Sequence, residues 1–363
     1  MRALILAASA ALLVATPSGL SAQGFYPEAT AIGGVTFRQY DYEDGFGVDY
    51  VRQLAFPIAV ALPLGKRFSV DIGTWYATTF VGQSGSHESF SDITDTQLRG
   101  TYVFGNDAVV ASLMLNLPTG PETTSLKSFG VAASSASNFL LFPVNTYGSG
   151  FSVTPGLAGA ITKGPWNLGL AASVRWSAEY QPFSGSANSN VNYQPGVEAR
   201  LRAGVDRLVG QGRMALGMTF STFANDELTG AGTFDPGNRL LIDGEFATPA
   251  GSGTVAFYAW NYYRSASGGT SGKEDVFTAG VSGSWAIGTK ARLEPLVEAR
   301  FWSPEDGSGR LFGAGSSLRY QLSPRFTLVP TVRVDVGSVE TPTSNGTKSV
   351  LGWELGTLLK VGL

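Results

Sequence analysis

The chain has 363 residues, of which 43% are hydrophobic and only 15% are charged, and it contains 47 glycines and no cysteine. The lack of cysteine excludes thiol catalysis, disulfides, iron–sulfur clusters and cysteine zinc sites. The net charge of −3 disfavours nucleic acid as a partner, because phosphate binding needs a basic face. A helical membrane protein would be more apolar and a disordered chain more charged, so these values favour an all-β protein.

The first residues have the layout of a secretory signal peptide. A short basic start precedes an unbroken run of small or apolar residues over 3–15, and small residues follow up to Ala22. An anchor helix is the weaker interpretation, because about 20 apolar residues are needed to span a bilayer. We therefore predict a signal peptide over residues 1–22 and a mature chain over residues 23–363, although Leu20 leaves the exact cleavage bond open.

The mature part alternates apolar and polar residues over short segments, which is the period-two pattern of strands with two different faces. The clearest case is 291–302, and the same pattern recurs in 166–180, 197–207 and 326–336. Short turns near 65–67, 105–107, 163–165, 210–212, 250–252, 288–290 and 323–325 alternate with longer polar loops at 41–48, 81–91, 118–148, 181–191, 225–237, 265–273, 303–309 and 338–347.

Short turns on one side and long loops on the other are typical of a bacterial outer-membrane barrel. The pattern predicts an all-β, antiparallel, up-and-down transmembrane barrel of about 16 strands, with 12–14 strands as the alternative and both termini periplasmic. A soluble sandwich would also alternate, and a propeller would repeat a motif every 40–50 residues. No such repeat is found, and the alternation of turn and loop lengths favours the barrel.

The two faces of these strands differ in charge, which assigns one to lipid and the other to a wet lumen. An arginine on the lipid face would cost roughly 2–4 kcal/mol at the bilayer midplane. The charged residues predicted to line the lumen are Arg99, Arg175, Glu198, Arg200, Arg202, Arg292, Glu294, Glu298, Arg300, Arg319, Arg333 and Asp335. They either set a transverse field that selects solutes or form a self-neutralising network that stiffens the barrel. Their near balance of sign predicts weak ion selectivity in both cases.

Three further segments carry a family resemblance. Residues 92–120 hold an aspartate-led strand, a turn and a strand that ends in Leu117-Pro118-Thr119-Gly120, and Tyr147-Gly148-Ser149-Gly150 precedes the strand 153–160 and then Trp166. These segments resemble the outer-membrane family named for the meta-pathway of phenol degradation, and the resemblance covers about 90 residues, the rest matching by architecture alone. The resemblance implies an outer-membrane channel or transporter for aromatic or other hydrophobic compounds.

The residues of the Leu-Pro-Thr-Gly motif can also be explained by their backbone chemistry, without the family. Pro118 lacks an amide N–H and ends ladder pairing, while Gly120 allows the chain to turn, so the motif ends a strand and hinges a loop. Residues 355–363 alternate up to the terminal Leu363. This end resembles the signal read by the barrel-assembly machinery, although the usual last residue is phenylalanine or tryptophan.

The longest predicted connection, 118–148, joins the fifth and sixth strands and contains few charges. Its place resembles that of the loop that narrows the pore of sixteen-stranded general porins. One interpretation is an inward loop that forms a largely apolar constriction, and the other is an extracellular extension with its aromatic residues on the rim. The candidate constriction residues are Pro118, Thr119, Gly120, Phe129, Phe139, Leu140 and Phe142.

A catalytic site is not predicted. The only histidine, His87, lies in a polar loop beside Ser86 and Ser89, where neighbouring loop residues rarely form a preorganised site. The carboxylates alternate with arginines that would repel a metal ion. We predict a passive channel for small solutes without cofactor, with outer-membrane lipid and the assembly machinery as partners. A structural or adhesive barrel with an occluded lumen is the alternative, and an outer-membrane hydrolase is less favoured.

Overall fold

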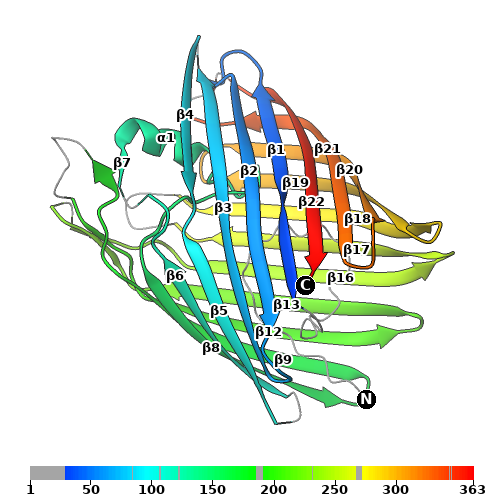
Figure 1. Ribbon diagram of the computed structural model, residues 1–363. Coiled ribbons are helices and arrows are strands. Elements are labelled where there is room, and N and C mark those ends of the chain that lie inside the picture. The colour runs from blue at the N-terminus through cyan, green and yellow to red at the C-terminus, as the bar shows by residue number, and fades with distance from the viewer. Residues whose placement is uncertain are drawn as a thin grey trace.

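The computed structural model describes residues 29–363 except 84, 106–107, 122, 185–190, 231, 267–271, 343 and 345. The segment predicted to be a signal peptide, residues 1–22, lies outside the described residues. Seventeen strands form one sheet that closes on itself into a barrel (Figure 1). Two of them, β4 and β5, pair in succession with the same neighbour, so the wall has 16 strand positions.

The strands of the wall are β1 (Thr30–Tyr42), β2 (Tyr50–Pro63), β3 (Phe68–Gln83), β4 (Ser86–Ile93), β5 (Thr96–Phe104), β6 (Val109–Leu117), β8 (Ser152–Lys163), β9 (Trp166–Ser177), β12 (Glu198–Val209), β13 (Gly212–Phe223), β16 (Arg239–Ala250), β17 (Gly253–Arg264), β18 (Glu274–Ile287), β19 (Ala291–Pro304), β20 (Ser308–Gln321), β21 (Phe326–Glu340) and β22 (Lys348–Gly362). The connections contain β7 (Thr124–Ser125), α1 (Leu126–Ser134), β10 (Phe183–Ser184), β11 (Tyr193–Gln194), β14 (Asp226–Leu228) and β15 (Gly232–Phe234).

Each wall strand pairs antiparallel with its neighbours in chain order, and a seam between β1 and β22 closes the barrel. The register of this seam runs from Thr30 opposite Gly362 to Tyr42 opposite Val350. The amide N–H of Leu363 donates to the carbonyl of Ala29 at 2.8 Å, so both described ends lie at the short-turn end. The predicted closed up-and-down barrel of 16 strands is thereby confirmed.

The alternating sequence produces two different surfaces, as the period of two requires. On β19, Val297 is 63% exposed on the outside, whereas its neighbour Glu298 is 8% exposed and Arg300 is 2% exposed on the inside. At the short-turn end, Gly164 and Gly210 have φ values near +60°, a conformation that favours glycine and permits a tight hairpin.

Two predicted loops are shorter than the sequence indicated. Residues 81–91 are mostly strand, because β3 and β4 continue as a paired hairpin to Gln83 opposite Ser86. Their polar composition suggested a loop, but Thr78 and Ser91 pair across the hairpin through their hydroxyls at 2.9 Å. The loop expected at 303–309 is reduced to residues 305–307 between β19 and β20. In both cases the strand contains few apolar residues, so its composition resembles that of a loop.

Candidate functional site: the lumen and its inward loop

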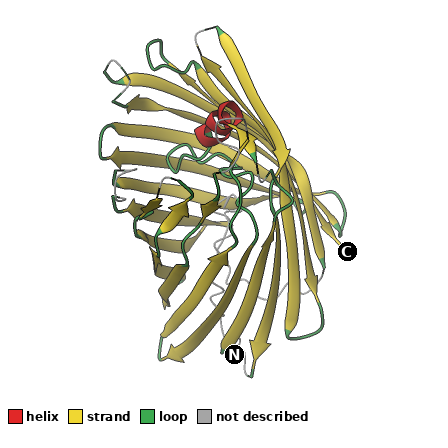
Figure 2. Ribbon diagram, turned by 90° about the vertical axis from the view of Figure 1, so that its left-hand side faces the viewer, coloured by secondary structure: helices red, strands yellow, loops and turns green. Residues whose placement is uncertain are grey.

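The connection between β6 and β8, residues 118–151, folds into the barrel. It passes through α1, whose N-cap Ser125 accepts a hydrogen bond from the amide of Ser128 at 3.1 Å. The helix lies near the long-loop end beside β4, where Lys127 pairs with Glu88 at 2.7 Å (Figures 1 and 2). Residues 138–147 then run along the inner face of strands β18 to β22 and β1 to β3. The structure therefore favours the inward loop over the extracellular extension.

Both ends of this loop are hydrogen-bonded to one carboxylate, that of Asp95 in the short gap between β4 and β5. Its Oδ1 accepts from the amide of Gly120 at 3.1 Å, and its Oδ2 accepts from the amide of Ser149 and from Asn116 Nδ2, both at 2.7 Å. The amide of Asp95 donates to the carbonyl of Tyr147 at 3.0 Å. Two of the sequence segments that carried the family resemblance, 92–120 and 147–150, thus meet at Asp95, and we call this group of hydrogen bonds the clasp.

The clasp also explains the glycine at the end of the Leu-Pro-Thr-Gly segment. A Cβ at Gly120 would stand 2.4 Å from the carbonyl oxygen of Tyr147 and 2.9 Å from the amide nitrogen of Asp95. Thr119 Oγ1 donates to the carbonyl of Thr94 at 3.0 Å, and Pro118 lies on the rim beside it. Thr119 and Gly120 therefore attach the loop to the wall, in agreement with the interpretation of this motif as a hinge, and Pro118 is exposed at the start of the loop.

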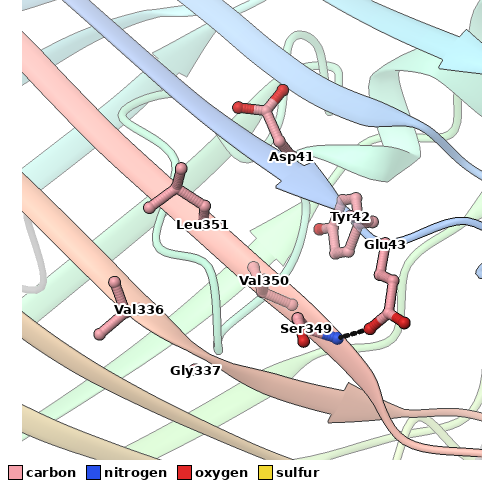
Figure 3. A pocket seen from close by; sticks show the side chains of 8 residues that line it. All are labelled: Asp41, Tyr42, Glu43, Val336, Gly337, Ser349, Val350 and Leu351. Carbon is pink, nitrogen blue, oxygen red and sulfur yellow. Dashed lines mark hydrogen bonds between the residues drawn. The ribbon is translucent and has the colours of Figure 1, made fainter.

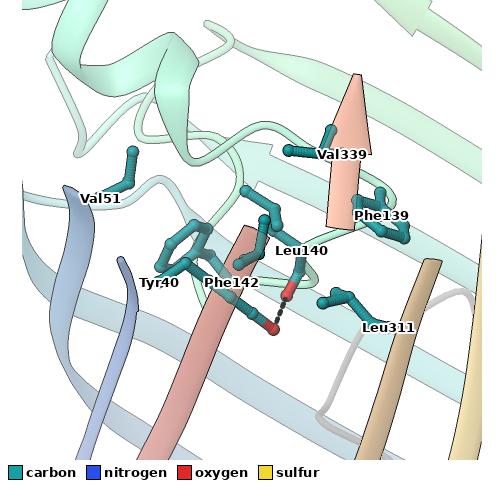
Figure 4. Packing of buried hydrophobic residues seen from close by; sticks show 8 residues of the cluster. Tyr40, Val51, Phe139, Leu140, Phe142, Leu311 and Val339 are labelled. Atoms are coloured by element: carbon teal, nitrogen blue, oxygen red, sulfur yellow. Dashed lines mark hydrogen bonds between the residues drawn. The ribbon is translucent and has the colours of Figure 1, made fainter. Parts of the chain in front are cut away.

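Arginines fasten the far part of the loop to the wall through its backbone carbonyls. Arg300 Nη1 donates to the carbonyl of Phe139 at 2.5 Å, and Arg38 Nη1 donates to the carbonyl of Leu141. Tyr40 Oη donates to the carbonyl of Leu140 at 2.8 Å (Figure 4). These donors are side chains on rigid strands, so this part of the loop has a fixed place in the lumen.

Carboxylates balance the charge of these buried arginines. Arg38 pairs with Glu354, and Arg300 pairs with Glu298 at 2.5 Å. Arg333 bridges Glu298 at 2.8 Å and Asp335 at 2.7 Å. A buried arginine is strongly destabilising unless its charge is matched, and these carboxylates match it. The terminal Nη groups of Arg38 and Arg300 are hydrogen-bonded, whereas the Nε atoms of both are buried without a partner among the described residues. Four predicted lumen residues thus act as supports of the loop: Glu298, Arg300, Arg333 and Asp335.

The apolar side chains of the loop face the wall. Phe139, Leu140 and Phe142 are all at most 8% exposed and form a cluster with Tyr40, Leu311 and their neighbours (Figure 4). Phe139 stacks on Trp302 with ring centroids 5.6 Å apart. The expected apolar constriction is therefore wrong for these three residues, because burying them against the wall removes more apolar surface from water than exposing them to the lumen. Phe129 lies on α1 and is 45% exposed.

The last part of the loop rests on β2 and β3. Gln53 exchanges two hydrogen bonds with the backbone of Val144, at 2.7 and 2.8 Å. Tyr147 and Thr79 join their hydroxyls at 2.6 Å, and burial raises the pKa of Tyr147 to about 12. The sequence analysis missed Arg38, Tyr40 and Gln53. Their signal was weak, because Arg38 and Tyr40 share the inward face of β1 with small residues such as Gly34 and Thr36, and Gln53 stands alone between the apolar inward residues Val51 and Ala55 of β2.

The opposite wall, from β5 to β17, keeps its arginines partly exposed to the lumen, while two of their carboxylate partners, Glu198 and Asp206, are buried and a third, Asp71, lies on the neighbouring β3. The ion pairs there are Arg99–Asp71 at 2.6 Å, Arg200–Glu198 at 2.6 Å, Arg202–Asp243 at 2.9 Å and Arg213–Asp206 at 3.0 Å. The arginine side chains in these pairs are 25–31% exposed. Arg175 lies opposite Glu198 in the register of β9 and β12. We call this surface the open wall, and the surface from β18 through β22 to β3 the covered wall.

Two predicted lumen arginines lie away from both groups, toward the short-turn end of the barrel. Arg319 pairs with Glu294 at 3.3 Å, and Arg292 donates from Nε to Ser284 Oγ at 3.2 Å. The twelve predicted lumen residues therefore do not form one filter. The structure divides them among the loop supports, the open wall and this lower group.

The depression drawn in Figure 3 lies between the long-loop ends of β1, β21 and β22 and has a volume of 390 Å³. In it, the Ser349 amide donates to Glu43 Oε2 at 3.0 Å, and this hydrogen bond lowers the pKa of Glu43. Elsewhere, His87 Nδ1 lies 3.0 Å from Tyr50 Oη, while Ser86 Oγ donates to the carbonyl of Gln83 at 2.8 Å. The structure does not pair Ser86 with His87.

Within the described ranges, no cluster of three or more histidine, aspartate or glutamate side chains is placed to hold a metal ion. No helix in this part of the chain is both long enough and apolar enough to cross a membrane.

No family model and no curated protein matches the chain. Among solved structures, it is similar to a bacterial polysaccharide outer membrane secretin, with 11% identity, a TM-score of 0.46, and coverage of 93% of this chain and 98% of the other. It is also similar to an anion-selective porin from Comamonas acidovorans, with 13% identity, a TM-score of 0.43, and coverage of 92% and 98%. OmpT of Vibrio cholerae shows 10% identity, a TM-score of 0.44 and the same coverage. At these values the likeness assigns no activity to this chain.

Proposed function

We propose that the chain is an outer-membrane channel through which small solutes diffuse passively. A closed barrel with an apolar outer surface satisfies every backbone hydrogen bond within lipid. Short turns at one end and long loops at the other are the layout of bacterial outer-membrane barrels, and on this basis we infer that the termini are periplasmic. Diffusion through such a lumen needs no cofactor and no covalent step.

One observation carries the proposal: residues 139–144 of the inward loop are hydrogen-bonded to the covered wall, whereas the start of the loop, β7, pairs with β10 at the mouth of the barrel. The contacts of residues 138–147 with the wall run from β18 through β22 to β3, and the arginines of the open wall stay partly exposed beside their carboxylate partners. Exposed ion pairs cost little in a wet lumen and much in a dry one. A water-filled path along the open wall, narrowed from the other side by the loop, accounts for both features.

Hydrophobic or aromatic compounds are the solutes that the resemblance of residues 92–120 suggests. Strand β17 offers a surface for flat rings in this lumen. Tyr258 faces inward, since its hydroxyl donates to Glu298 at 2.8 Å, and Trp260 and Tyr262 share its face by the period of two. Aromatic faces in a row beside charged groups favour solutes that carry a ring.

Recording single channels in planar bilayers tests the proposal. A variant that lacks residues 124–142 retains Asp95, Gly120 and Ser149, and should give larger current steps than the complete chain. A matched control lacks the rim hairpin β14–β15 and should conduct like the complete chain. Equal steps from the 124–142 variant would contradict a narrowing role for the loop.

The alternative is a structural or adhesive barrel whose lumen the loop occludes. Silence of the complete chain, from a barrel whose folding is verified by its heat-dependent gel mobility, would favour that alternative. A hydrolase is the less favoured reading, and we propose no enzymatic activity, because the hydroxyl beside His87 belongs to Tyr50.

We further propose that the assembly machinery recognises the last strand. Its outward residues Leu355 and Leu363 are 51% and 61% exposed, so the apolar signal predicted for residues 355–363 lies on the lipid-facing surface.

A further inference from the structure

A compact polar cluster stands on the outer surface of the barrel, at the long-loop end of β2, β3 and β4. The guanidinium carbon of Arg52 lies 4.9 Å from the ring centre of Tyr50 and 4.7 Å from that of Phe80. The Tyr50 hydroxyl meets Nδ1 of His87 at 3.0 Å. With Glu88 and Ser89, these residues line a depression of 530 Å³, and the carboxylate of Glu88 is paired with Lys127 at 2.7 Å. They face outward, because in the register Arg52 lies opposite Phe80, next to the inward pair of Gln53 and Thr79.

The height of the cluster follows from the outward residues of β2. Alternate positions from Leu54 to Leu64 are apolar, and Ile58 is 55% exposed among them. Ten residues at about 3.4 Å each, tilted by about 45°, span roughly 24 Å. An outer-membrane barrel carries an apolar band about 25 Å tall. Arg52 therefore lies just above the band, at the level where lipid headgroups begin.

The neighbouring strands confirm this level. Across the seam, Gln39 lies opposite both Arg52 and Trp353. Trp353 packs on Phe37 with ring centroids 4.7 Å apart. Tryptophan and tyrosine gather at the membrane–water interface, where one end of the side chain is apolar and the other is wet.

Arg52 has its charge unmatched at this level. In the described part of the chain, no carboxylate lies within 4.0 Å of its guanidinium. The two rings hold the guanidinium in place over their faces, which lowers the entropy lost when it binds an anion. A guanidinium forms paired hydrogen bonds with phosphate oxygens, and a hydroxyl and an imidazole stand beside it as further donors.

We propose that Arg52, with Tyr50, His87 and Ser89, binds the phosphate of a lipid headgroup in the outer leaflet. The inference rests on the proposed placement of the long-loop end outside the cell, and it does not depend on conduction. A lipid is the source that fits, because the cluster borders the apolar band and not the lumen. The lipid's acyl chains would then lie along the outward side chains of Leu54 and Phe56.

Native mass spectrometry of the purified protein in detergent tests the site, with diphosphoryl lipid A and its dephosphorylated form as probes. The complete chain should retain the diphosphoryl form, and Arg52→Gln should weaken this retention by about tenfold, the size of one charge-assisted hydrogen bond. Arg207→Gln is the matched control. Arg207 also lies over one aromatic ring, with its guanidinium carbon 4.9 Å from the centre of Trp166, but at the short-turn end. It should leave retention unchanged.

Three results would overturn the proposal. They are equal retention by Arg52→Gln, equal loss in Arg207→Gln, and equal retention of the dephosphorylated lipid. Displacement of the lipid by millimolar inorganic phosphate would show a free-anion site and would also count against it. Planar-bilayer currents from the same preparations separate this outcome from the channel proposal, because a conducting protein without lipid binding refutes only the headgroup site.

Discussion

The covered wall and the open wall use the same residue type in opposite ways. On the covered wall, Arg38 and Arg300 are 6% and 2% exposed and donate to backbone carbonyls of the loop. On the open wall, Arg200 and Arg202 are about a quarter to a third exposed and pair with carboxylates. An arginine of this barrel therefore supports the loop where the loop covers it, and it lines the lumen where nothing covers it.

Removing one arginine from each wall should give the largest contrast. Arg300→Gln leaves Glu298 with less positive charge around it and frees the carbonyl of Phe139, so we expect a loss of about 3 kcal/mol of unfolding free energy. Arg202→Gln removes a partly exposed pair and should cost about 0.5 kcal/mol. Urea unfolding in detergent, followed by circular dichroism, measures both. Losses of equal size would refute the division into a covered and an open wall.

The clasp at Asp95 should show the next largest effect. Asp95→Asn weakens the hydrogen bonds from Gly120 and Ser149, at an expected cost of about 1.5–3 kcal/mol to the attachment of the loop. The barrel itself should persist, because the wall strands do not depend on this carboxylate. Limited trypsin digestion at Lys127 should become faster. The control Asp71→Asn, which loses the pair with Arg99 on the open wall, should be cut at the rate of the unaltered chain.

The smallest predicted effect is on the ion selectivity of the channel. A unit charge about 8 Å from the path of an ion, in water, changes its energy by about 0.5 kcal/mol, or roughly twofold in local concentration. Arg202→Glu should therefore shift the reversal potential in a salt gradient toward cation selectivity, and Arg333→Gln should not, because Arg333 is buried in the loop support. A shift for Arg333→Gln as large as that for Arg202→Glu would contradict the assignment of the open wall.

Most of the fold could be predicted from the sequence, because the period-two alternation in segments such as 291–302 and the alternating lengths of turns and loops are local signals. The polar hairpin of β3 and β4 was missed, since beyond the apolar band a strand need not carry apolar residues. The position of the loop 118–151 was harder to predict. Its low charge and its aromatic residues predicted that it meets something apolar, but which surface it meets depends on residues more than 100 positions away, such as Arg38 for Leu141.

The charged residues predicted for the lumen show the same limit, because their burial cannot be predicted from the local sequence. Arg300 and Arg202 have similar neighbours in the sequence, and both alternate with apolar residues. Only the path of the loop separates them, because it buries one and leaves the other in the lumen. The clasp at Asp95 was within closer reach, since the segments around Gly120 and Ser149 were both singled out, but their meeting at one carboxylate requires the closed register of β3, β5 and β6.

The seam between β1 and β22 has a consequence for how the barrel forms. It joins residues as far apart as Thr30 and Gly362, whereas the other wall strands are each followed by the next one in the chain. The free energy of this pairing is gained only after the whole sheet has curved round, so closure carries the largest chain-entropy cost and comes late. Until then, two strand edges offer unpaired amides and carbonyls to any other chain. Gly34 makes the final contact tight, since a Cβ there would stand 2.3 Å from the carbonyl oxygen of Thr357. A bulkier residue at position 34 would therefore let every hairpin form but would keep β1 and β22 from pairing, so the barrel would not close.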